Sequence, residues 1–299
     1  MKLVNIDLPV NKRGFRRFIS SWLIRDDARD RTYIVDTGPG STWAIVRESI
    51  EKYGEGRLDG VLLTHVHLDH AGAAPMAYAD YGAPMSVSPK GIPHLLNPEA
   101  LWEGSVKTLG ETAFLYGRPD PLPEEAIMAD EDLPEGITAI ETPGHASHHR
   151  CFILDEGDKG KTLFAGEAAS IFLEGEEPFP YLRPATPPRF FPEITLESIE
   201  KLIPLGCRKI CYSHFGAAEG APELLALAKD QILFWRDTVK ELFKRGVSPD
   251  DEESIFNELI EKDPFLAAWK RMEPDIKERE REFLGNSIRG FAGAYGKAS

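Results

Sequence analysis

The feature that most constrains this chain is a cluster of metal-binding side chains that directly follows a short apolar segment. Gly60–Leu63 predicts a buried strand, and four potential ligands come within the next residues: His65, His67, Asp69 and His70. Side chains alternate along an extended segment, so the first two histidines lie on the same side. A turn then brings the other two ligands to the same pocket. Imidazoles and carboxylates bind zinc and similar divalent metals, whereas isolated histidines are usually exposed or hydrogen-bonded in the core. The density of the cluster favours a metal site.

Short segments rich in β-branched and aromatic residues recur along the first two thirds of the chain and predict strands. These segments are 3–8, 18–24, 32–35, 60–63, 85–87, 137–140, 151–154, 162–164 and 209–212. Helical spacing of apolar residues separates some of them, with Ser41 as the expected N-cap and Gly54 as the C-cap of one helix. A second helix is expected before Gly206. This order predicts a layered α/β or α+β domain.

From about residue 220 the pattern predicts helices alone. A long helix is expected to present one apolar face, formed by Leu225, Ala228, Ile232, Trp235, Val239 and Leu242. Ser248–Asp251 resembles a helix start, and Pro264 and Pro274 begin two more short helical pieces. We therefore divide the chain into 1–219 and a helical C-terminal extension, 220–299. The apolar face is expected to pack on the main domain, and a homodimer contact remains an alternative.

Two stretches, Lys90–Leu133 and Gly175–Pro192, are expected to be long ordered loops that act as lids or walls of a binding site. The second contains Arg183 and Arg189, which either bind a substrate carboxylate or are ordinary solvated arginines. Its aromatic residues, including Phe190 and Phe191, either line an apolar acyl pocket or pack in the core.

The balance of charge and the cysteine content restrict partners and compartment. The formal net charge of −14 and the lack of a long basic run count against a nucleic-acid partner. No signal peptide and no apolar run long enough to span a membrane are recognised, so no membrane partner is expected. Cys151, Cys207 and Cys211 have no zinc-ribbon spacing and are expected to be buried thiols, which fits a cytoplasmic protein.

Further motifs accompany the cluster in a fixed order along the chain. Tyr33–Gly38 is a strand and turn containing Asp36, and Thr142–His145 is a loop that ends in a histidine. Leu163–Glu167 is a strand that ends in a carboxylate, and Ser213–Gly216 contains His214. With the His-x-His-x-Asp-His cluster, this combination resembles the metallo-β-lactamase superfamily over about residues 30–218. The resemblance implies an αββα sandwich with metals at one edge of its two sheets.

The same resemblance implies a site for two divalent metal ions, with zinc as the expected metal and iron and manganese as alternatives that accept the same ligands. His65, His67 and His145 would bind the first ion, and the second would be bound by Asp69, His70 and His214. Glu167 stands where the family usually has aspartate, so it either bridges the ions, binds one of them, or lies outside the ligand set.

Four other polar residues near the motifs have roles that the sequence leaves open. Asp36 is expected to be a buried carboxylate behind the ligands or a simple turn residue. His148 and His149 are expected either to support the ligands or to have a structural role. His94 is expected at the surface or in a pocket wall.

A metal-activated water predicts hydrolysis of an ester, thioester or lactone of small-molecule size, with Asp69 as the catalytic residue that directs the nucleophile or transfers its proton. The helical extension resembles that of the hydroxyacylglutathione hydrolase and thioesterase-like branch in architecture only. Three alternatives remain: a single-iron persulfide dioxygenase, a non-catalytic metal-binding regulator, and a nuclease, which the acidic charge disfavours.

Overall fold

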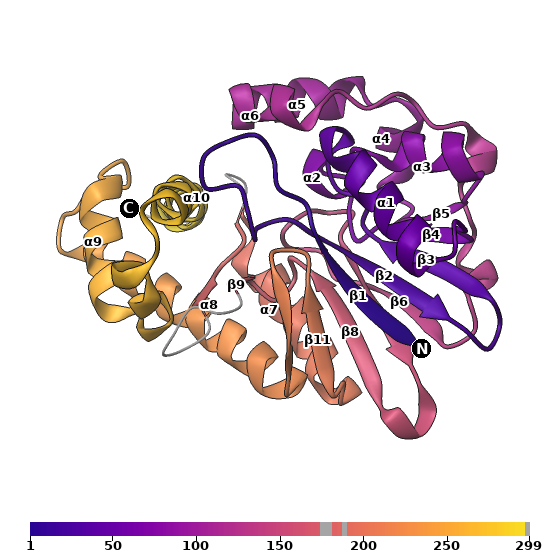
Figure 1. Ribbon diagram of the computed structural model, residues 1–299. Coiled ribbons are helices and arrows are strands. Elements are labelled where there is room, and N and C mark those ends of the chain that lie inside the picture. The colour runs from indigo at the N-terminus through magenta and orange to yellow at the C-terminus, as the bar shows by residue number, and fades with distance from the viewer. Residues whose placement is uncertain (174–180, 187–189, 297–299) are drawn as a thin grey trace.

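Two five-stranded sheets form the centre of the protein in the computed structural model, which describes residues 1–173, 181–186 and 190–296 (Figure 1). The first sheet has the order β1-β2-β3-β4-β5 and the second the order β12-β11-β8-β7-β6. The strands of the first sheet are Lys2–Asp7, Ser20–Asp26, Arg31–Val35, Gly60–Leu62 and Met85–Ser86. The second sheet contains Gly216–Glu219, Lys209–Tyr212, Lys161–Gly166, Arg150–Asp155 and Ile137–Glu141. A separate hairpin pairs β9 (Ile171–Leu173) with β10 (Tyr181–Arg183).

The two sheets pack face to face, and helices cover their outer faces. Trp22 of β2 and Phe164 of β8 meet in the layer between the sheets, with ring centroids 6.4 Å apart, and Trp22 Nε1 donates a hydrogen bond to the carbonyl of Tyr212. Every residue of β2 is buried, as expected for a strand with a covered face on each side. Figure 1 shows α1 (Trp43–Tyr53) and α3 (Ala74–Tyr81) beside the first sheet, and α7 (Pro192–Leu202) beside the second. The architecture is the expected αββα sandwich.

Helices make up the described part of the C-terminal region. They are α8 (Ala221–Lys244), α9 (Glu252–Lys262), a 3-10 helix (Pro264–Arg271) and α10 (Pro274–Tyr295). The apolar face predicted for α8 is buried within the chain, where α8 contacts α7, α10 and β10. The packing therefore needs no second copy. A homodimer contact and the division at residue 220 remain predictions.

Some elements differ from the sequence-based expectations. The stretch Lys90–Leu133 is not one loop, because it contains α4 (Ile92–Leu96), α5 (Glu99–Leu109) and α6 (Glu111–Tyr116). Ser41 does not cap α1, since a 3-10 turn at Gly40–Thr42 precedes that helix and no side chain caps it, whereas Gly54 ends it as expected. The strands β9, β10 and β12 were not predicted, and α10 is long rather than short.

Two expectations about the chain as a whole can be compared directly with the structure. The three cysteines are free and buried, as predicted. None of the helices in the described ranges combines the length and the apolar character that a membrane crossing requires.

Candidate metal centre

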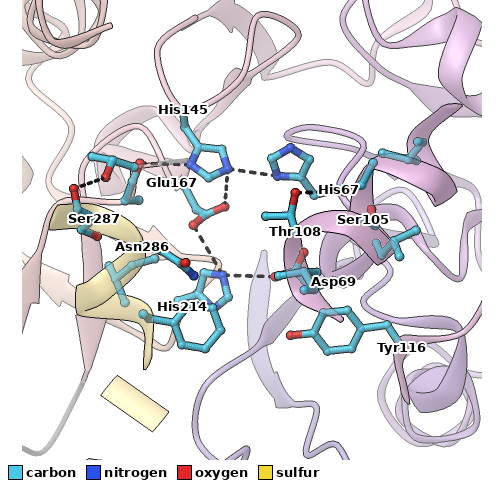
Figure 2. Close-up of a pocket in the computed structure, with 18 of the residues that line it drawn as sticks. His67, Asp69, Ser105, Thr108, Tyr116, His145, Glu167, His214, Asn286 and Ser287 are labelled. Atoms are coloured by element: carbon cyan, nitrogen blue, oxygen red, sulfur yellow. Dashed lines mark hydrogen bonds and ion pairs between the residues drawn. The ribbon is translucent and has the colours of Figure 1, made fainter. Parts of the chain in front are cut away.

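The predicted ligands lie at one edge of the sandwich because each follows the end of a strand. His65, His67, Asp69 and His70 follow β4, and His145 follows β6. Glu167 follows β8, and His214 follows β11. Both sheets therefore contribute to the site, and Figure 2 shows His67, Asp69, His145, Glu167 and His214 pointing toward a common centre.

The side chains form two adjacent groups. In the first, one donor atom from each of His65, His67, His145 and Glu167 lies within 4.8 Å of the others, and the second contains Asp69, His70 and His214 within the same limit. Nδ1 of His67 is 3.0 Å from Nε2 of His145. Two nitrogens bound tetrahedrally to one zinc ion are about 3.3 Å apart, given Zn–N bonds of about 2.0–2.1 Å.

The carboxylate of Glu167 lies between the two groups. Its Oε2 atom is 2.9 Å from His145 Nε2 and 3.5 Å from His70 Nε2. Its other oxygen, Oε1, is 3.6 Å from His214 Nε2. The methylene that distinguishes glutamate from the family's usual aspartate therefore does not remove this carboxylate from the site.

Hydrogen bonds on the outer side of the imidazoles orient the inner nitrogens. His145 Nδ1 donates to the carbonyl of Ala185 at 3.1 Å, and His214 Nδ1 donates to the carbonyl of Phe18 at 2.9 Å. A carbonyl only accepts hydrogen bonds, so each Nδ1 carries the proton and each Nε2 keeps a lone pair directed at the centre.

Two of the inner nitrogens have no hydrogen-bond partner, as expected for atoms that coordinate a metal ion. Among the described residues, Nε2 of His65 and Nε2 of His70 are fully buried and have no hydrogen-bond partner of good geometry. Unpaired buried polar atoms are costly and rare in folded proteins. A bound cation removes this cost, so the nitrogen and carboxylate donors fit a divalent metal.

Asp36 is both a turn residue and a buried carboxylate behind the ligands. Its backbone has φ of 59°, and its side chain is buried. Its carboxylate accepts hydrogen bonds from the Thr64 N–H at 2.8 Å and from Ser213 Oγ at 2.7 Å, and it lies 3.3 Å from His70 Nδ1. It therefore connects the segments that follow β3, β4 and β11.

The structure separates the roles of the two adjacent histidines. His149 is fully buried, and its Nε2 accepts the backbone N–H of Glu167 at 3.0 Å, so it positions that carboxylate. Gly166 has φ of 54°, and a Cβ there would lie 2.4 Å from His149 Nε2. His148 instead lines the cavity beside His94, with ring centroids 5.6 Å apart.

Several residues around the site were not singled out from the sequence. Thr64 and Ser213 adjoin His65 and His214 in the chain, but nothing in the sequence marks their hydrogen bonds to Asp36. Only the tertiary fold brings Tyr116 and Asn286 to the cavity.

The electrostatic environment favours the metal-binding forms of four donors, whereas at His70 and His145 the neighbouring carboxylates outweigh burial and raise the pKa. Burial and the neighbouring His145 lower the pKa of His67 to about 3, and burial lowers the pKa of His214 to about 4. Burial opposes ionisation of Asp69, but the neighbouring His70 outweighs it and lowers the pKa of Asp69 to about 2. Burial is likewise outweighed at Glu167, where His145 holds the pKa well below its usual value. Neutral imidazoles and ionised carboxylates are the forms that bind metals.

A cavity of about 360 Å³ opens in front of these side chains. Leu101, Ser105 and Thr108 of α5 line one wall (Figure 2), and residues of α10 line another. Of the two alternatives for Arg183, the solvated one is wrong, because the side chain is buried in the cavity wall, where it forms an ion pair with Glu280 at 2.7 Å. Arg189 lies outside the described residues.

The two phenylalanines of the second stretch have different environments. Phe190 packs in the core, with its ring centroid 4.9 Å from that of Phe291, whereas Phe191 is 56% exposed. Neither is among the described residues that line the cavity.

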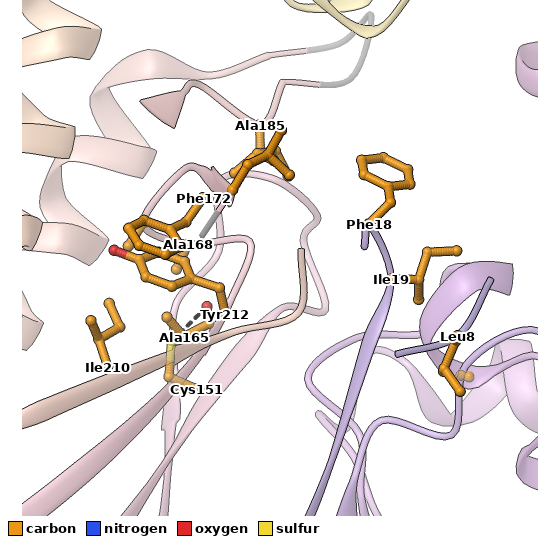
Figure 3. Close-up of a cluster of buried hydrophobic side chains, with 14 of the residues drawn as sticks. Leu8, Phe18, Ile19, Cys151, Ala165, Ala168, Phe172, Ala185, Ile210 and Tyr212 are labelled. Atoms are coloured by element: carbon orange, nitrogen blue, oxygen red, sulfur yellow. Dashed lines mark hydrogen bonds between the residues drawn. The ribbon is translucent and has the colours of Figure 1, made fainter. Parts of the chain in front are cut away.

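An apolar layer supports the ligand segments from behind. Figure 3 shows Phe172 and Tyr212 in this cluster, and their rings stack with centroids 4.7 Å apart and planes inclined by 6°. Cys151, Ala165 and Ile210 complete the layer under the ends of β8 and β11. Close packing there fixes the loops that carry Glu167 and His214.

Comparisons with known proteins agree with this geometry. Residues 14–214 match the sequence model of the Metallo-beta-lactamase superfamily. The metallo-beta-lactamase fold-containing protein ST1585 of Sulfurisphaera tokodaii is 28% identical over 59% of this chain and 67% of its own length. The atrochrysone carboxyl ACP thioesterase of Aspergillus fumigatus is 29% identical over 62% of this chain, and a hydroxyacylglutathione hydrolase of Hydrogenovibrio crunogenus is 30% identical over 52%. The matched segments span 47% and 50% of those two enzymes.

Solved structures share the fold over nearly the whole chain. The archaeal metallo-beta-lactamase superfamily protein ST1585 superposes with a TM-score of 0.68 at 21% identity, covering 97% of both chains. The family protein TTHA1429 of Thermus thermophilus superposes with a TM-score of 0.64 at 20% identity, covering 99% of this chain and 93% of that one.

Proposed function

The chain belongs to the metallo-β-lactamase superfamily and is one of its hydrolases, and on that premise we propose that it cleaves a small-molecule ester, thioester or lactone. The observation that carries this proposal is the convergence of seven donor side chains from four strand ends at one edge of the sandwich, where five of them line a cavity. The names of two relatives, a thioesterase and a hydroxyacylglutathione hydrolase, support this substrate range over a nucleic acid.

We assign the ligands to two divalent ions. His65, His67 and His145 would hold one ion, and a second would be held by Asp69, His70 and His214. Glu167 would contact both, which its distances of 2.9 Å to His145 and 3.6 Å to His214 support. When bound, such a pair supplies a water of lowered pKa and polarises the substrate carbonyl. Zinc is the expected metal, and the same donors accept iron or manganese.

Asp69 is the residue that we propose to act on the nucleophile. Its Oδ2 atom is 3.4 Å from His70 Nε2 and 3.5 Å from His214 Nε2, and its side chain lines the cavity. A carboxylate held there can accept a proton from the attacking water and orient its oxygen toward the acyl carbon. The water oxygen bonds to that carbon as the C–S or C–O bond breaks, and the leaving group takes up the proton.

Replacement of one ligand tests the proposal. We expect His67→Ala and His145→Ala to lose hydrolysis of thioesters, lactones and esters, and to bind less metal, because each removes a donor from the first group. Elemental analysis of the purified variants and a hydrolysis screen with these substrates and a phosphodiester measure both effects. His94→Ala is the matched control, since His94 lines the cavity outside the ligand set and its loss should leave the metal content unchanged.

Normal activity and metal content in both ligand variants would contradict the assignment. Iron in the purified protein, with oxygen consumption in the presence of a persulfide, would instead support the dioxygenase alternative. Bound metal without hydrolysis of any substrate in the screen would support a regulator.

A further inference from the structure

We propose that the cavity contains an anion-binding subsite formed by Arg183 and Asn286, so that the preferred substrate carries a negatively charged group such as a carboxylate. This inference rests on the proposed hydrolytic function and narrows its substrate class. It follows from the unused hydrogen-bond donors of Arg183, the charge of the surrounding cluster, and the shape of the cavity.

The first observation is that Arg183 is buried in the cavity wall with most of its donors unused. Its side chain is only 4% exposed, and its Nε donates to Glu280 Oε2 at 2.7 Å. This is its one hydrogen bond within the described ranges. The Nη2 atom of Arg279 is fully buried and has no hydrogen-bond partner. The two Nη atoms of Arg183 also have no partner in the described ranges, but they are not fully buried. The free nitrogens of Arg183 therefore border the cavity, whose wall this residue helps to form.

The second observation is a surplus of positive charge. Glu280 is fully buried between Arg183 and Arg279, with Nε of Arg279 at 2.9 Å from its Oε1. Two guanidinium groups against one carboxylate leave one positive charge. Arg183 is also the sole arginine or lysine among the described residues that line the cavity. The carboxylates that share this lining, Asp69 and Glu167, belong to the proposed metal centre, where two divalent cations would compensate them.

The third observation is that the neighbouring polar groups leave one more donor. Ser287 Oγ donates to the carbonyl of Pro184 at 2.7 Å, and Thr186 Oγ1 donates to the carbonyl of Ser287 at 3.0 Å, so both hydroxyls are used to hold the wall. Asn286 Oδ1 accepts from Arg289 at 2.5 Å, which leaves the amide Nδ2 free. Figure 2 shows Asn286 on the same side of the cavity as His214.

The opposite wall of the cavity is uncharged and therefore suits an uncharged part of the substrate. α5 presents Ala100, Leu101 and Leu109 together with the small residues Gly104 and Ser105, and offers no charge. A planar guanidinium with two free nitrogens binds a carboxylate through paired hydrogen bonds. The cavity therefore orients a substrate with its scissile carbonyl at the metal centre and its anionic group between Arg183 of β10 and Asn286 of α10.

The test compares four thioesters that differ in one charge. S-succinyl N-acetylcysteamine carries a carboxylate on the acyl side, and S-butyryl N-acetylcysteamine is its uncharged match. S-butyryl 3-mercaptopropionate carries the carboxylate on the leaving group. S-butyryl propanethiol is the uncharged match for the last compound. In one of the two pairs, we expect the wild type to prefer the charged thioester over its uncharged match by about tenfold to a hundredfold in kcat/KM. The pair that shows this preference identifies whether the acyl group or the leaving group carries the charge.

Arg183→Gln should abolish most of this preference, and Arg183→Lys should restore part of it. Asn286→Asp is a second variant that leaves the buried ion pair intact, and its added negative charge should also reduce the preference. Arg279→Gln is the matched control, because it removes the other partner of Glu280 from outside the cavity lining. Because it also removes the surplus charge, it should lower the ratio between charged and uncharged substrates, but clearly less than Arg183→Gln, which removes the hydrogen-bond donors in the cavity as well.

Equal rates for charged and uncharged substrates in the wild type would overturn the inference, as would equal effects of Arg183→Gln and Arg279→Gln on the ratio. Calorimetric titration with succinate and butyrate separates this inference from the proposed function. If no thioester is cleaved but succinate binds more tightly than butyrate only while Arg183 is present, the anion subsite stands and the hydrolytic proposal fails. If Arg183→Gln does not fold, the response of Asn286→Asp decides.

Discussion

At the scale of single residues, the metal centre depends on groups that never touch the cavity. Asp36 accepts hydrogen bonds from Thr64 and Ser213 while it faces His70, and His149 holds the backbone of Glu167. These outer contacts fix which nitrogen or oxygen points inward. They also constrain the ligands more tightly than strand ends alone do.

We expect Asp36→Asn to weaken metal binding by about tenfold to a hundredfold. The amide has one accepting oxygen instead of two, and it lacks the negative charge that faces His70. Competition with a fluorescent chelator measures the affinity. Ser213→Ala, which removes one of the same hydrogen bonds, should have a smaller effect. Equal affinities of wild type and Asp36→Asn would show that the carboxylate is a turn residue only.

We expect Glu167→Asp to be tolerated, with hydrolytic activity retained and metal content equal to or above that of the wild type. Aspartate keeps the charge, and the family usually has it at this position. Elemental analysis and kcat/KM measure the outcome, and Glu167→Gln, which keeps the length but not the charge, is the control. Complete loss of metal from Glu167→Asp would instead make the longer side chain essential, since Oε2 reaches His145 at 2.9 Å.

At the scale of helices and strands, predictability follows from burial. The strands β2, β4 and β8 are enclosed by the two sheets and the helices, so their apolar runs mark them clearly in the sequence. α5 has no fully buried residue, and Gly110 and Gly117 interrupt the helical pattern around α6, so this region was expected to be a loop. Within the part of the chain that the structure describes, β9 and β10 pair only with each other, and short isolated hairpins leave a weak pattern.

Asp263 illustrates how one side chain joins the C-terminal helices. It caps the 3-10 helix by accepting the Phe265 N–H at 2.9 Å, and its Oδ2 accepts from Trp235 at 2.7 Å and Gln231 at 2.8 Å. Asp251 caps α9 in the same way but at the surface, accepting the Ser254 N–H at 3.1 Å.

We expect Asp263→Ala to lower the free energy of unfolding by about 3 kcal/mol, because it removes a cap and leaves the buried Trp235 and Gln231 donors without an acceptor. Asp251→Ala should cost only about 1 kcal/mol, since water replaces its contacts. Urea denaturation followed by tryptophan fluorescence compares the two. A similar loss in both variants would mean that the cap alone accounts for the effect.

At the scale of the whole molecule, the site was more predictable than the cavity. The ligands follow strand ends in a recurrent order, and that order carries the resemblance to the superfamily. Arg183 and Asn286 have no such spacing, because β10 and α10 reach the cavity only through tertiary packing. The sequence therefore indicated the reaction class and offered Arg183 as one alternative for a carboxylate contact, but it did not indicate Asn286 or the cavity wall that α10 forms.

We expect the metal-free protein to lose stability as the pH falls from about 6.5 to about 4. Burial lowers the pKa of His67 to about 3, and of His148 and His214 to about 4. The unfolded chain therefore binds more protons than the folded chain in this interval, and acid favours unfolding. His70 and His145, with raised pKa values, oppose this trend, but the pKa is also lowered at His65 and His149.

Urea denaturation in the presence of a chelator at several pH values measures this dependence. The His148→Gln variant should show a shallower slope, since it removes one titrating group outside the proposed ligands. A free energy of unfolding that stays constant across the interval would contradict the expectation.

The contribution of α10 to the cavity wall has a consequence for biosynthesis. A ribosome adds His214, the last of the proposed metal ligands, before it has made Asn286 and Ser287. All the proposed ligands are therefore synthesised before the wall that would discriminate among substrates. Maturation would then have two separable stages, metal loading first and substrate selectivity only after the final helix docks.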